Sequence, residues 1–531
     1  MSVIEKNLLY PSMESIPRQF QITCRNEARC LINGKIIPAP GKEVYSPIQY
    51  RESAVIKNYR LGYTPWLDPS QALDAIKAAE LAYDYGWGVW PQMTIKERIH
   101  CVEEFALRMQ DLQEGFICQV MWEIAKPYQS SKDEFQRTLK YMEETIIHLR
   151  ELDKNAAKIH QIEGFAAQIR RSPLGPVLLM GPFNYPLNEA FAMFIPALIM
   201  GNTVVMKLPS WGCLCLDPFL DLLADSFPPG VVNIINGEGS KIIPPIVERG
   251  SINVLGFIGT TAVANKIIAD HPYNNRLRTI LGLEAKNPAF VFPDCDLELT
   301  VQECLQGALE FNGQRCTSLK HIWVHEEICE RFLDALSQAV AKIKYGMPWD
   351  QDVLLTPLAE EGKCERLLHW IYQAEEHGAK TVNPGGGEYA GNLFYPSILF
   401  PVTREMDIYH VEQFGPVIPV SSFRSLDDIA VYLAECQFGQ QASIFTNSAQ
   451  MAAPLIDILA HQVSRVNLNA QCRRGPDELP FTGRKDSAEG TLSIVDALRA
   501  FSIRSLVVAN EHGKELFNKI LAADNCKFLH R

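Results

Sequence analysis

Apolar residues between positions 68 and 149 recur at intervals of three and four. This spacing puts them on one face of a helix and predicts a run of amphipathic helices. We expect a first helix that opens near Gln71, after an Asp68-Pro69-Ser70 start, and further helices over 95–109, 113–124 and 132–149. Residues 1–40 lack this period and predict an irregular N-terminal arm, with an early hairpin around Asn33-Gly34.

A different pattern begins near residue 175, where short apolar runs alternate with helical stretches. The runs are spaced by about one strand-helix-strand unit and cover 177–180, 203–206, 231–235 and 254–258. This pattern is typical of a parallel sheet in a doubly wound α/β domain, a common place for a dinucleotide. No Gly-x-Gly-x-x-Gly fingerprint follows these runs, and Gly237-Glu238-Gly239 alone is a weak signal.

A second α/β segment is predicted after residue 281. It starts with a strand over 289–292 and continues through helices expected near 298–311, 327–344 and 360–377. Close to the end, the apolar run 503–508 predicts a strand that pairs with another element or subunit. The last twenty residues are interpreted as a tail.

Composition and charge narrow the class of protein. A chain of 531 residues is too long for one compact core, so two or three domains are expected. The hydrophobic fraction of 47% and the charged fraction of 21% are those of a globular protein. A net charge of −12 argues against nucleic acid as a partner, because phosphate backbones need a basic face.

Cysteines and apolar stretches indicate a cytoplasmic protein. The fourteen cysteines are scattered, without a Cys-x-x-Cys pair or a zinc spacing, so we expect no structural metal and a reducing compartment. The N-terminus has no signal-peptide pattern. The most apolar stretch, 176–206, contains Asn184, Glu189 and two prolines among its interruptions, so no membrane span is expected.

One thiol has surroundings that fit a nucleophile. Cys316 follows Arg315 and a turn at Gly313, within Phe311-Asn312-Gly313-Gln314-Arg315-Cys316-Thr317. A cationic neighbour and free backbone N–H groups lower a thiol pKa and hold an oxyanion, so we expect both effects here, before a helix-like continuation. The alternative is a buried structural cysteine, the ordinary role for any one of fourteen.

Six motifs in sequence order decide between these alternatives. Over roughly residues 70–505 the chain resembles the aldehyde dehydrogenase superfamily, through segments 181–186 (GPFNYP), 201–207 (GNTVVMK), 257–261 (FIGTT), 313–316 (GQRC), 412–416 (EQFGP) and 480–487 (PFTGRKDS). The resemblance implies that Cys316 attacks an aldehyde and that Asn184 and the Cys316 N–H stabilise the oxyanion. Hydride then passes to a nicotinamide, and the thioester is hydrolysed.

The same resemblance implies a cofactor site. It assigns the adenosine ribose to Lys207, the pyrophosphate to Gly259 and Thr260, and the nicotinamide half to Glu412 and Phe414. Gly237 is a further candidate. Relatives specific for NAD carry a glutamate three residues after the lysine, where this chain has Ser210. Loss of a carboxylate removes repulsion of a 2′-phosphate, so NADP is expected, with NAD possible.

Within the superfamily the chain looks most like the non-phosphorylating, NADP-dependent glyceraldehyde-3-phosphate dehydrogenases. Those enzymes hold the substrate phosphate with arginines and a tyrosine, and the matching positions here are Arg137, Tyr185, Arg315 and Arg474. Guanidinium groups suit phosphate geometry. We therefore expect a small phosphorylated aldehyde, glyceraldehyde 3-phosphate, as the substrate.

The chain departs from the family at the general base. Family spacing puts a glutamate 34 residues before the cysteine, and this position is Gly282. Glu284 lies two residues further on and shares a face of an extended chain with it, so it is either the base or a structural carboxylate. A missing base also favours an alternative, acyl transfer to coenzyme A or phosphate. A third hypothesis is a non-catalytic protein that keeps the fold and binds NADP.

The resemblance implies a Rossmann-like cofactor domain, an α/β catalytic domain and a small β oligomerisation element. We expect the parts at 1–40 (arm), 41–157 with 174–281 (cofactor), 282–490 (catalytic), 158–173 with 491–510 (oligomerisation) and 511–531 (tail). Family members with this element are commonly dimers or tetramers, so a homodimer or homotetramer is expected.

Overall fold

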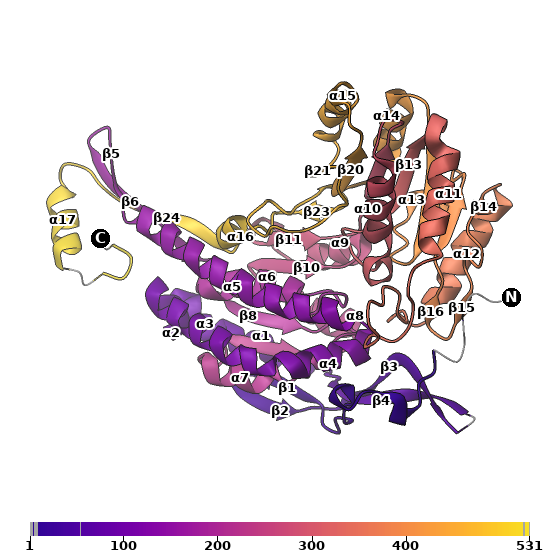
Figure 1. The fold of residues 1–531 in the computed structure, drawn as a ribbon. Helices are drawn as coiled ribbons and strands as arrows, with labels where there is room; N and C mark the ends of the chain where they lie inside the picture. Colours follow the sequence, from indigo (N-terminus) through magenta and orange to yellow (C-terminus); the bar gives the residue numbers. More distant parts are fainter. Residues whose placement is uncertain (1–3, 5–8, 54, 524–525, 530–531) are drawn as a thin grey trace.

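The computed structural model describes residues 4, 9–53, 55–523 and 526–529 and has a mixed α/β architecture (Figure 1). Among these residues, two large sheets form separate layers with helices packed on them. A three-stranded sheet projects from the body at the far end of the long helix α5. The expected α/β fold class is confirmed.

The eight-stranded sheet is parallel at its centre. Its order is β2-β1-β9-β8-β7-β10-β11-β23, with bounds β1 Arg29–Ile32, β2 Lys35–Pro38, β7 Pro176–Met180, β8 Thr203–Lys207, β9 Val232–Ile235, β10 Val254–Ile258, β11 Arg278–Gly282 and β23 Ala488–Glu489. Strands β7 to β11 run parallel, so their carboxyl ends meet at one edge. Ligands of such sheets bind outside that edge.

Side chains alternate between the two faces of this sheet. Val177 and Leu179 of β7 pack in one core cluster, with helices α6 and α7, while Leu178 and Met180 pack in another, with α1, α8 and α9. The helices on these faces and around them are α1 Pro69–Tyr83, α3 Ile95–Met109, α4 Gln113–Ile124, α5 Tyr128–Ala156, α6 Asn188–Ile199, α7 Phe219–Ser226, α8 Gly239–Val247 and α9 Thr261–Ala269.

The predicted N-terminal helices are confirmed. Helices α3 and α4 have the predicted bounds, and α3 starts at a capping box between Thr94 and Glu97. Helix α5 is longer than the predicted 132–149. The hairpin at Asn33-Gly34 is present, with both residues at positive φ. However, it is not a free arm, because β1 pairs with β9 and adds two strands to the eight-stranded sheet.

The seven-stranded sheet forms the second layer. Its order is β14-β17-β18-β13-β12-β20-β21, from β12 Pro288–Val291, β13 His321–His325, β14 Lys380–Thr381, β17 Ser397–Phe400, β18 Val417–Phe423, β20 Gln441–Phe445 and β21 Arg465–Leu468. The strand predicted over 289–292 is β12. Its helices are α10 Leu297–Leu309, α11 Cys329–Val340, α12 Lys363–Glu376, α13 Asp407–His410, α14 Leu426–Glu435 and α15 Ala449–Leu459, and the first three match the predicted segments.

The projecting arm joins segments that lie far apart in the sequence. Its order is β24-β6-β5, from β5 Ile159–Ile162, β6 Phe165–Pro173 and β24 Ser502–Ala509. Strand β24 confirms the predicted strand over 503–508 and pairs with β6 along its whole length. The predicted tail is not structureless, because it contains helix α17, Lys514–Ala523, which packs Phe517 and Leu521 against Ala166 and Ala509.

Smaller elements complete the described chain. They are the hairpin β3 Gly41–Glu52 with β4 Val55–Pro65, the short helices α2 Val89–Gln92 and α16 Ile494–Ala500, and the strand pairs β15 Tyr389–Ala390 with β16 Leu393–Phe394 and β19 Phe438–Gly439 with β22 Arg484–Lys485. No helix among the described residues is long and apolar enough to cross a membrane. All fourteen cysteines are described, and all are free thiols.

Candidate functional site

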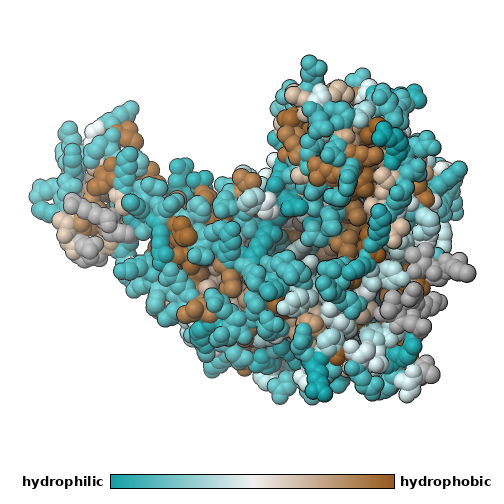
Figure 2. Space-filling model, in the orientation of Figure 1, coloured by the Kyte–Doolittle hydropathy of each residue, from teal (hydrophilic) through white to brown (hydrophobic). Residues whose placement is uncertain are grey.

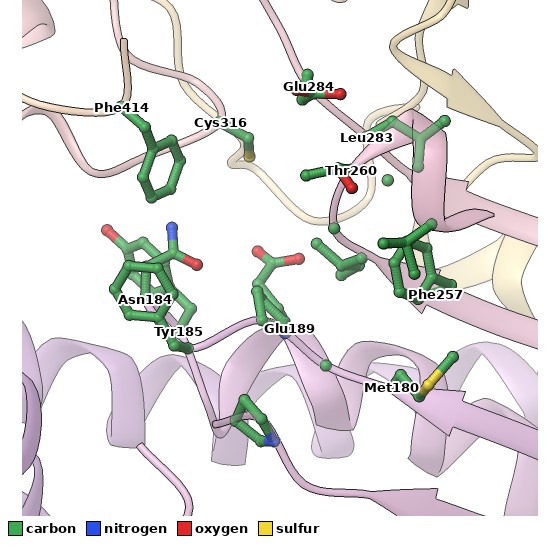
Figure 3. A pocket seen from close by; sticks show the side chains of 18 of the residues that line it. Met180, Asn184, Tyr185, Glu189, Phe257, Thr260, Leu283, Glu284, Cys316 and Phe414 are labelled. Atoms are coloured by element: carbon green, nitrogen blue, oxygen red, sulfur yellow. The ribbon is translucent and has the colours of Figure 1, made fainter. Parts of the chain in front are cut away.

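A cavity of about 1110 Å³ lies between the two large sheets. Its floor is the carboxyl edge of the eight-stranded sheet, where Met180 and Lys207 end their strands and Phe257 is the last residue but one of β10. Figure 3 shows Met180 and Phe257 at this edge. Its roof is made of loops from the other layer, including 315–317 and 473–475. Helix α6 starts at the cavity wall, directly after the segment that carries Asn184 and Tyr185.

The loop that carries Cys316 is fixed by its backbone. Helix α10 ends at Leu309, and Gly313 follows with a φ of +70°. A Cβ at Gly313 would lie 2.6 Å from the Ala308 carbonyl oxygen, so only glycine fits. The Asn287 side chain donates to the Cys316 carbonyl oxygen at 2.7 Å. The helix-like continuation expected after Cys316 is wrong, because the chain turns there and enters β13.

The expectation of a lowered pKa for Cys316 is also wrong. Burial is the largest effect on this thiol, and with the negative charges of Glu189 and Glu412 it raises the pKa to about 11. Arg315 does not offset this, because it pairs with Glu310 at 2.9 Å and donates to backbone carbonyls of α10. The neighbouring cation therefore secures the loop rather than activating the thiol.

Asn184 is held beside the cysteine loop by a buried ion pair. Its side-chain nitrogen donates to the Gln314 carbonyl oxygen at 2.7 Å. Its own carbonyl oxygen accepts from Lys126 at 2.9 Å, and Lys126 pairs with Glu134 at 2.6 Å, both fully buried. The second Glu134 oxygen accepts from the Leu187 and Asn188 backbone at the start of α6. One buried carboxylate thus joins α5, α6 and the Asn184 loop.

Tyr185 lies on the wall of the cavity. The Lys126 ammonium sits 3.5 Å from the centre of its ring, an interaction that fixes the orientation of the ring. Burial is the largest effect on the hydroxyl and raises its pKa above the ordinary range. The hydroxyl is therefore a neutral hydrogen-bond donor at any ordinary pH.

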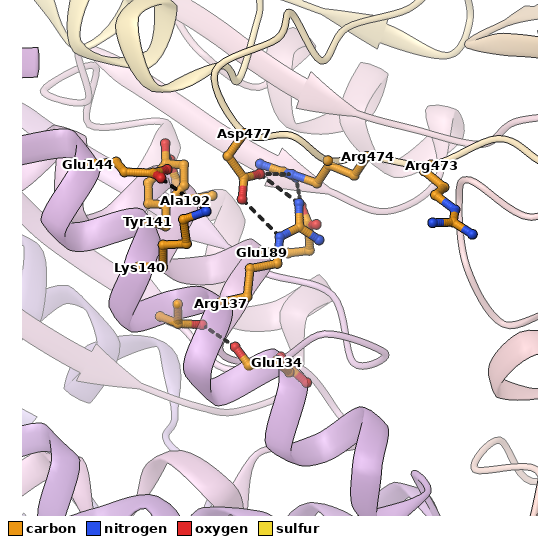
Figure 4. A network of polar contacts seen from close by, with 12 residues as sticks. Glu134, Arg137, Lys140, Tyr141, Glu144, Glu189, Ala192, Arg473, Arg474 and Asp477 are labelled. Carbon is orange, nitrogen blue, oxygen red and sulfur yellow. Dashed lines mark hydrogen bonds and ion pairs between the residues drawn. The ribbon is translucent and has the colours of Figure 1, made fainter. Parts of the chain in front are cut away.

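Arginines and carboxylates form one network at the wall of the cavity (Figure 4). Arg137 on α5 holds Asp477 with two hydrogen bonds, of 2.9 and 2.6 Å. Arg474 forms an ion pair with Glu189, and its Nε lies 3.5 Å from Asp477. Among the described residues, the buried Nη2 of Arg474 has no hydrogen-bond partner. The buried Nε of Arg474 also has no hydrogen-bond partner among these residues, so the network leaves two buried nitrogens of this guanidinium without an acceptor.

Two cavity residues were not identified from the sequence. Glu189 is 7% exposed and lies in the first turn of α6. In the sequence it was only an interruption of an apolar stretch, although it follows Asn184 by five residues. Arg473 is exposed beside Arg474 and forms no ion pair within the described chain. Its position directly before a candidate arginine was the signal that could have found it.

The cofactor candidates lie at the opposite end of the cavity. Lys207 at the end of β8 is buried, which lowers its pKa to about 8, and its ammonium has no hydrogen-bond partner among the described residues. Ser210, Gly259 and Thr260 also line this end. Gly237 does not, because it packs against the Leu67 carbonyl oxygen. Gly239 and Ser240, at the start of α8, take its place on the wall.

Glu412 and Phe414 line the cavity, and both lie close to Lys320. Glu412 is buried and pairs with Lys320 at 3.4 Å, and burial raises the pKa of its carboxyl group. The same lysine lies 4.7 Å from the centre of the Phe414 ring. Phe414 is held at a φ of +42° and packs against Phe183, with 5.9 Å between the ring centres.

The Glu284 side chain is bound at the cofactor end of the cavity. Its carboxylate accepts a hydrogen bond of 3.0 Å from the Thr261 backbone N–H, at the first residue of α9. This contact favours the structural interpretation of Glu284, one of the two left open by the sequence. Gly282 lines the cavity, and a Cβ at this position would lie 3.2 Å from the Ile258 side chain. No carboxylate therefore stands at position 282.

Comparisons with known proteins agree with this arrangement. The model of the aldehyde dehydrogenase family matches residues 50–507. A curated NADP-dependent glyceraldehyde-3-phosphate dehydrogenase from Streptococcus equinus is 31% identical over 447 residues, which are 83% of this chain and 91% of that protein. A malonate-semialdehyde dehydrogenase from Bacillus cytotoxicus is 28% identical over 468 residues, covering 87% and 93% of the two chains.

A solved structure matches over nearly its whole length. It is the NADP-dependent glyceraldehyde-3-phosphate dehydrogenase from Bacillus halodurans, crystallised with NADP, with a TM-score of 0.83 and 30% identity. The match covers 91% of this chain and 99% of that one.

Proposed function

Because the chain belongs to the aldehyde dehydrogenase family, we propose that it oxidises a phosphorylated aldehyde with NADP as hydride acceptor. The proposed substrate is glyceraldehyde 3-phosphate and the proposed product is 3-phosphoglycerate. Similar proteins with the same activity in their names support the choice of substrate at 30–31% identity. A malonate-semialdehyde dehydrogenase is similar to the chain at 28% identity, so the identity of the substrate is what the experiment has to test.

One observation carries the choice of a phosphorylated substrate. Arg474 lines the cavity with a buried guanidinium nitrogen that lacks a hydrogen-bond partner among the described residues. Buried donors are almost always paired, so this position calls for an acceptor on a ligand. Arg137 and the Tyr185 hydroxyl lie on the same cavity wall. A phosphate accepts from several such donors at once.

The chain's own residues account for the first chemical step. Cys316 Sγ loses its proton to solvent and attacks the aldehyde carbon, and a C–S bond forms as the carbonyl oxygen becomes an oxyanion. The Asn184 amide keeps one hydrogen free of its bond to Gln314 and donates it to this oxygen, together with the Cys316 N–H. NADP held at the far end of the cavity would supply the acceptor for the hydride that leaves the same carbon, which becomes a thioester.

The residues at the far end of the cavity fit NADP. A buried Lys207 ammonium without a partner among the described residues suits a ribose or phosphate oxygen. Ser210 adds a hydroxyl without adding negative charge, which suits a 2′-phosphate. Thr260 and the first turn of α9 lie beside Gly259 and offer backbone N–H groups for the pyrophosphate, whereas the Gly259 N–H itself donates to the Gly282 carbonyl oxygen. Glu412 and Phe414 line the same cavity, and we propose that they hold the nicotinamide half.

The runner-up function is acyl transfer to coenzyme A or to phosphate. It is favoured by one observation, the glycine at the position of the family's general base. A non-catalytic protein that binds NADP is less well supported, because Cys316, Asn184 and Arg474 all line the same cavity.

Formation of NADPH separates these functions. Enzyme, NADP and glyceraldehyde 3-phosphate are mixed, and absorbance is followed through the first turnover, with Cys316→Ser as the control. Sustained turnover without an added acceptor supports hydrolysis. A single stoichiometric burst that coenzyme A or phosphate converts to turnover supports the runner-up. A protein that binds NADP but gives no burst excludes both enzymatic functions.

The proposal extends to the organisation of the molecule. We propose that the eight-stranded sheet and its helices form the cofactor domain and that the seven-stranded sheet and its helices form the catalytic domain. The projecting arm is the proposed oligomerisation element of a homodimer or homotetramer. Fourteen free thiols fit a reducing compartment, and we propose the cytoplasm.

A further inference from the structure

Hydrolysis of the thioester needs a proton acceptor that position 282 does not supply. Glu284, the nearest alternative in the sequence, is held by the Thr261 N–H at the cofactor end. The other carboxylates on the cavity wall include Glu310, Glu360 and Glu412, which pair with Arg315, with Lys363 and Arg366, and with Lys320. The remaining glutamate on the wall is Glu189.

Glu189 lies on the same side of the cavity as the oxyanion donor. It follows Asn184 by five residues, and its backbone N–H donates to the Tyr185 carbonyl oxygen at 3.2 Å. Figure 3 shows its carboxylate directed into the space between Asn184 and Cys316. Oε2 accepts from Arg474, whereas Oε1 has no hydrogen-bond partner among the described residues. One oxygen therefore positions the group, and the other faces the reaction space.

We propose that Glu189 is the general base of thioester hydrolysis, in place of the family's glutamate at position 282. The proposal rests on the proposed function. A water molecule between Glu189 Oε1 and the thioester carbon loses a proton to Oε1 while its oxygen bonds to that carbon. The oxyanion accepts from Asn184, and the C–S bond then breaks with its electron pair on Sγ.

The proton balance of this step fits the cysteine. The acid leaves as the product, Glu189 carries the proton taken from water, and Cys316 is a thiolate. Burial and nearby carboxylates favour the protonated form of this thiol, so the proton passes from Glu189 to Sγ. Both groups return to their starting states, and no oxidant or reductant takes part.

Arg474 connects this base to the substrate. Its Nη1 holds Glu189, and its Nη2 is the buried donor proposed for the substrate phosphate. A bound phosphate shares the positive charge of Arg474, which weakens the hold of the guanidinium on the Glu189 carboxylate. A phosphorylated substrate therefore leaves the Glu189 carboxylate freer to act on water and promotes the release of its own acyl group.

The test compares the burst with the steady state in Glu189→Gln. Glutamine keeps the shape of the side chain and still accepts from Arg474, but it does not take a proton. We expect a burst of one NADPH per site, as in the wild type, and a steady-state rate at least about 100-fold lower. Mass spectrometry should show the acyl group on Cys316. Hydroxylamine, which cleaves thioesters without a base, should restore turnover as a hydroxamate.

Two further variants make the outcome specific. Glu189→Asp keeps a carboxylate and should recover part of the steady-state rate. At saturating NADP, where its predicted effect on cofactor affinity does not enter, Glu284→Gln should keep the wild-type ratio of the steady-state rate to the burst. The proposal is overturned if Glu189→Gln turns over at the wild-type rate, or if it gives no burst. It is also overturned if Glu284→Gln gives a burst without further turnover. A wild type that forms no NADPH at all contradicts the proposed function instead, and a wild type that needs coenzyme A for turnover contradicts hydrolysis itself.

Discussion

The environment of Cys316 shows how far a single residue can be interpreted from its neighbours in sequence. Arg315 is adjacent in the chain, yet its guanidinium pairs with Glu310 and does not reach the thiol. The charges that raise the pKa of Cys316 come from Glu189 and Glu412, which are remote in sequence, while Arg474 and Lys320 act in the opposite direction. A pKa depends on burial and on the charges that lie nearby in space. The adjacent arginine in the sequence therefore predicted the direction of the Cys316 pKa shift wrongly.

The raised pKa of Cys316 predicts slow alkylation at neutral pH. Only the thiolate reacts, so labelling of this residue by iodoacetamide should rise about tenfold per pH unit from pH 7 and level off near pH 11. The rate is measured by mass spectrometry of the peptide that contains Cys316, which separates it from the other thirteen cysteines. A rate that levels off below pH 8 would show that the thiol is activated in the free enzyme.

Glu284 predicts an effect on cofactor affinity. Its carboxylate accepts from the N-terminus of α9, the same end that the pyrophosphate needs, and the two negative charges repel each other. Glu284→Gln keeps an acceptor for Thr261 but removes the charge, and NADP should bind roughly 3- to 10-fold more tightly, which is about 1 kcal/mol. Calorimetric titration measures the NADP affinity, with Glu298→Gln, at an exposed position of α10, as the control. Weaker binding would contradict the assignment.

At the scale of elements, the sequence predicted the helices best. Helices α3 and α4 were placed to the residue, since apolar periodicity is local and Thr94 with Glu97 marks a start. The sheet pairings were less accessible. The pairing of β1 with β9 joins residues about 200 positions apart in the sequence. Helix α17 packs against Ala166 and Ala509, and Ala166 is also remote from it in the sequence. Such contacts leave no local pattern.

The same difference between local patterns and long-range contacts explains which residues of the candidate site the sequence predicted. Asn184, Lys207 and Cys316 belong to motifs and line the cavity as predicted. Glu189 was missed because its partner Arg474 lies 285 residues away in the sequence. Gly237 was proposed from a glycine pattern alone, and its role is packing against Leu67. Motifs identify residues that share a family's chemistry, whereas pairings between distant side chains appear only in the folded chain.

The ion pair of Lys126 and Glu134 predicts a strong effect on stability at the junction of α5 and α6. Glu134→Gln leaves a buried ammonium without its counter-charge and should lower the free energy of unfolding by about 3–5 kcal/mol. A double variant, Lys126→Met with Glu134→Gln, removes both charges and should be less destabilised than the single variant. Urea unfolding measures both. A single variant as stable as the wild type would contradict the structural role of this pair.

At the scale of the whole molecule, the projecting arm is the part least covered by the rest of the chain. Figure 2 shows apolar side chains gathered on it beside hydrophilic ones. Strand β24 is an edge of its sheet, and its Leu506 and Val508 are 56% and 51% exposed. Exposed apolar edge strands are normally covered by another element or subunit, which agrees with the proposed oligomer.

An acidic residue on this strand should shift the oligomeric state. Leu506→Asp places a charge on the exposed face of β24 and should convert a dimer or tetramer to smaller species, as measured by light scattering during gel filtration. Leu516→Asp, on a similarly exposed site of α17 outside the strand, is the matched control. A wild type that is monomeric at micromolar concentration would contradict the role of the arm.

The central claim is that the protein oxidises an aldehyde whose phosphate group is bound in this cavity. The most direct test is the ratio of kcat/KM for glyceraldehyde 3-phosphate to that for glyceraldehyde, in the wild type and in Arg474→Met. Loss of a charge-assisted pair costs roughly 1.5–3 kcal/mol, or about 10- to 150-fold. We predict a ratio of at least about 100 in the wild type that falls by such a factor in the variant. Equal kcat/KM values for the two aldehydes would contradict the account.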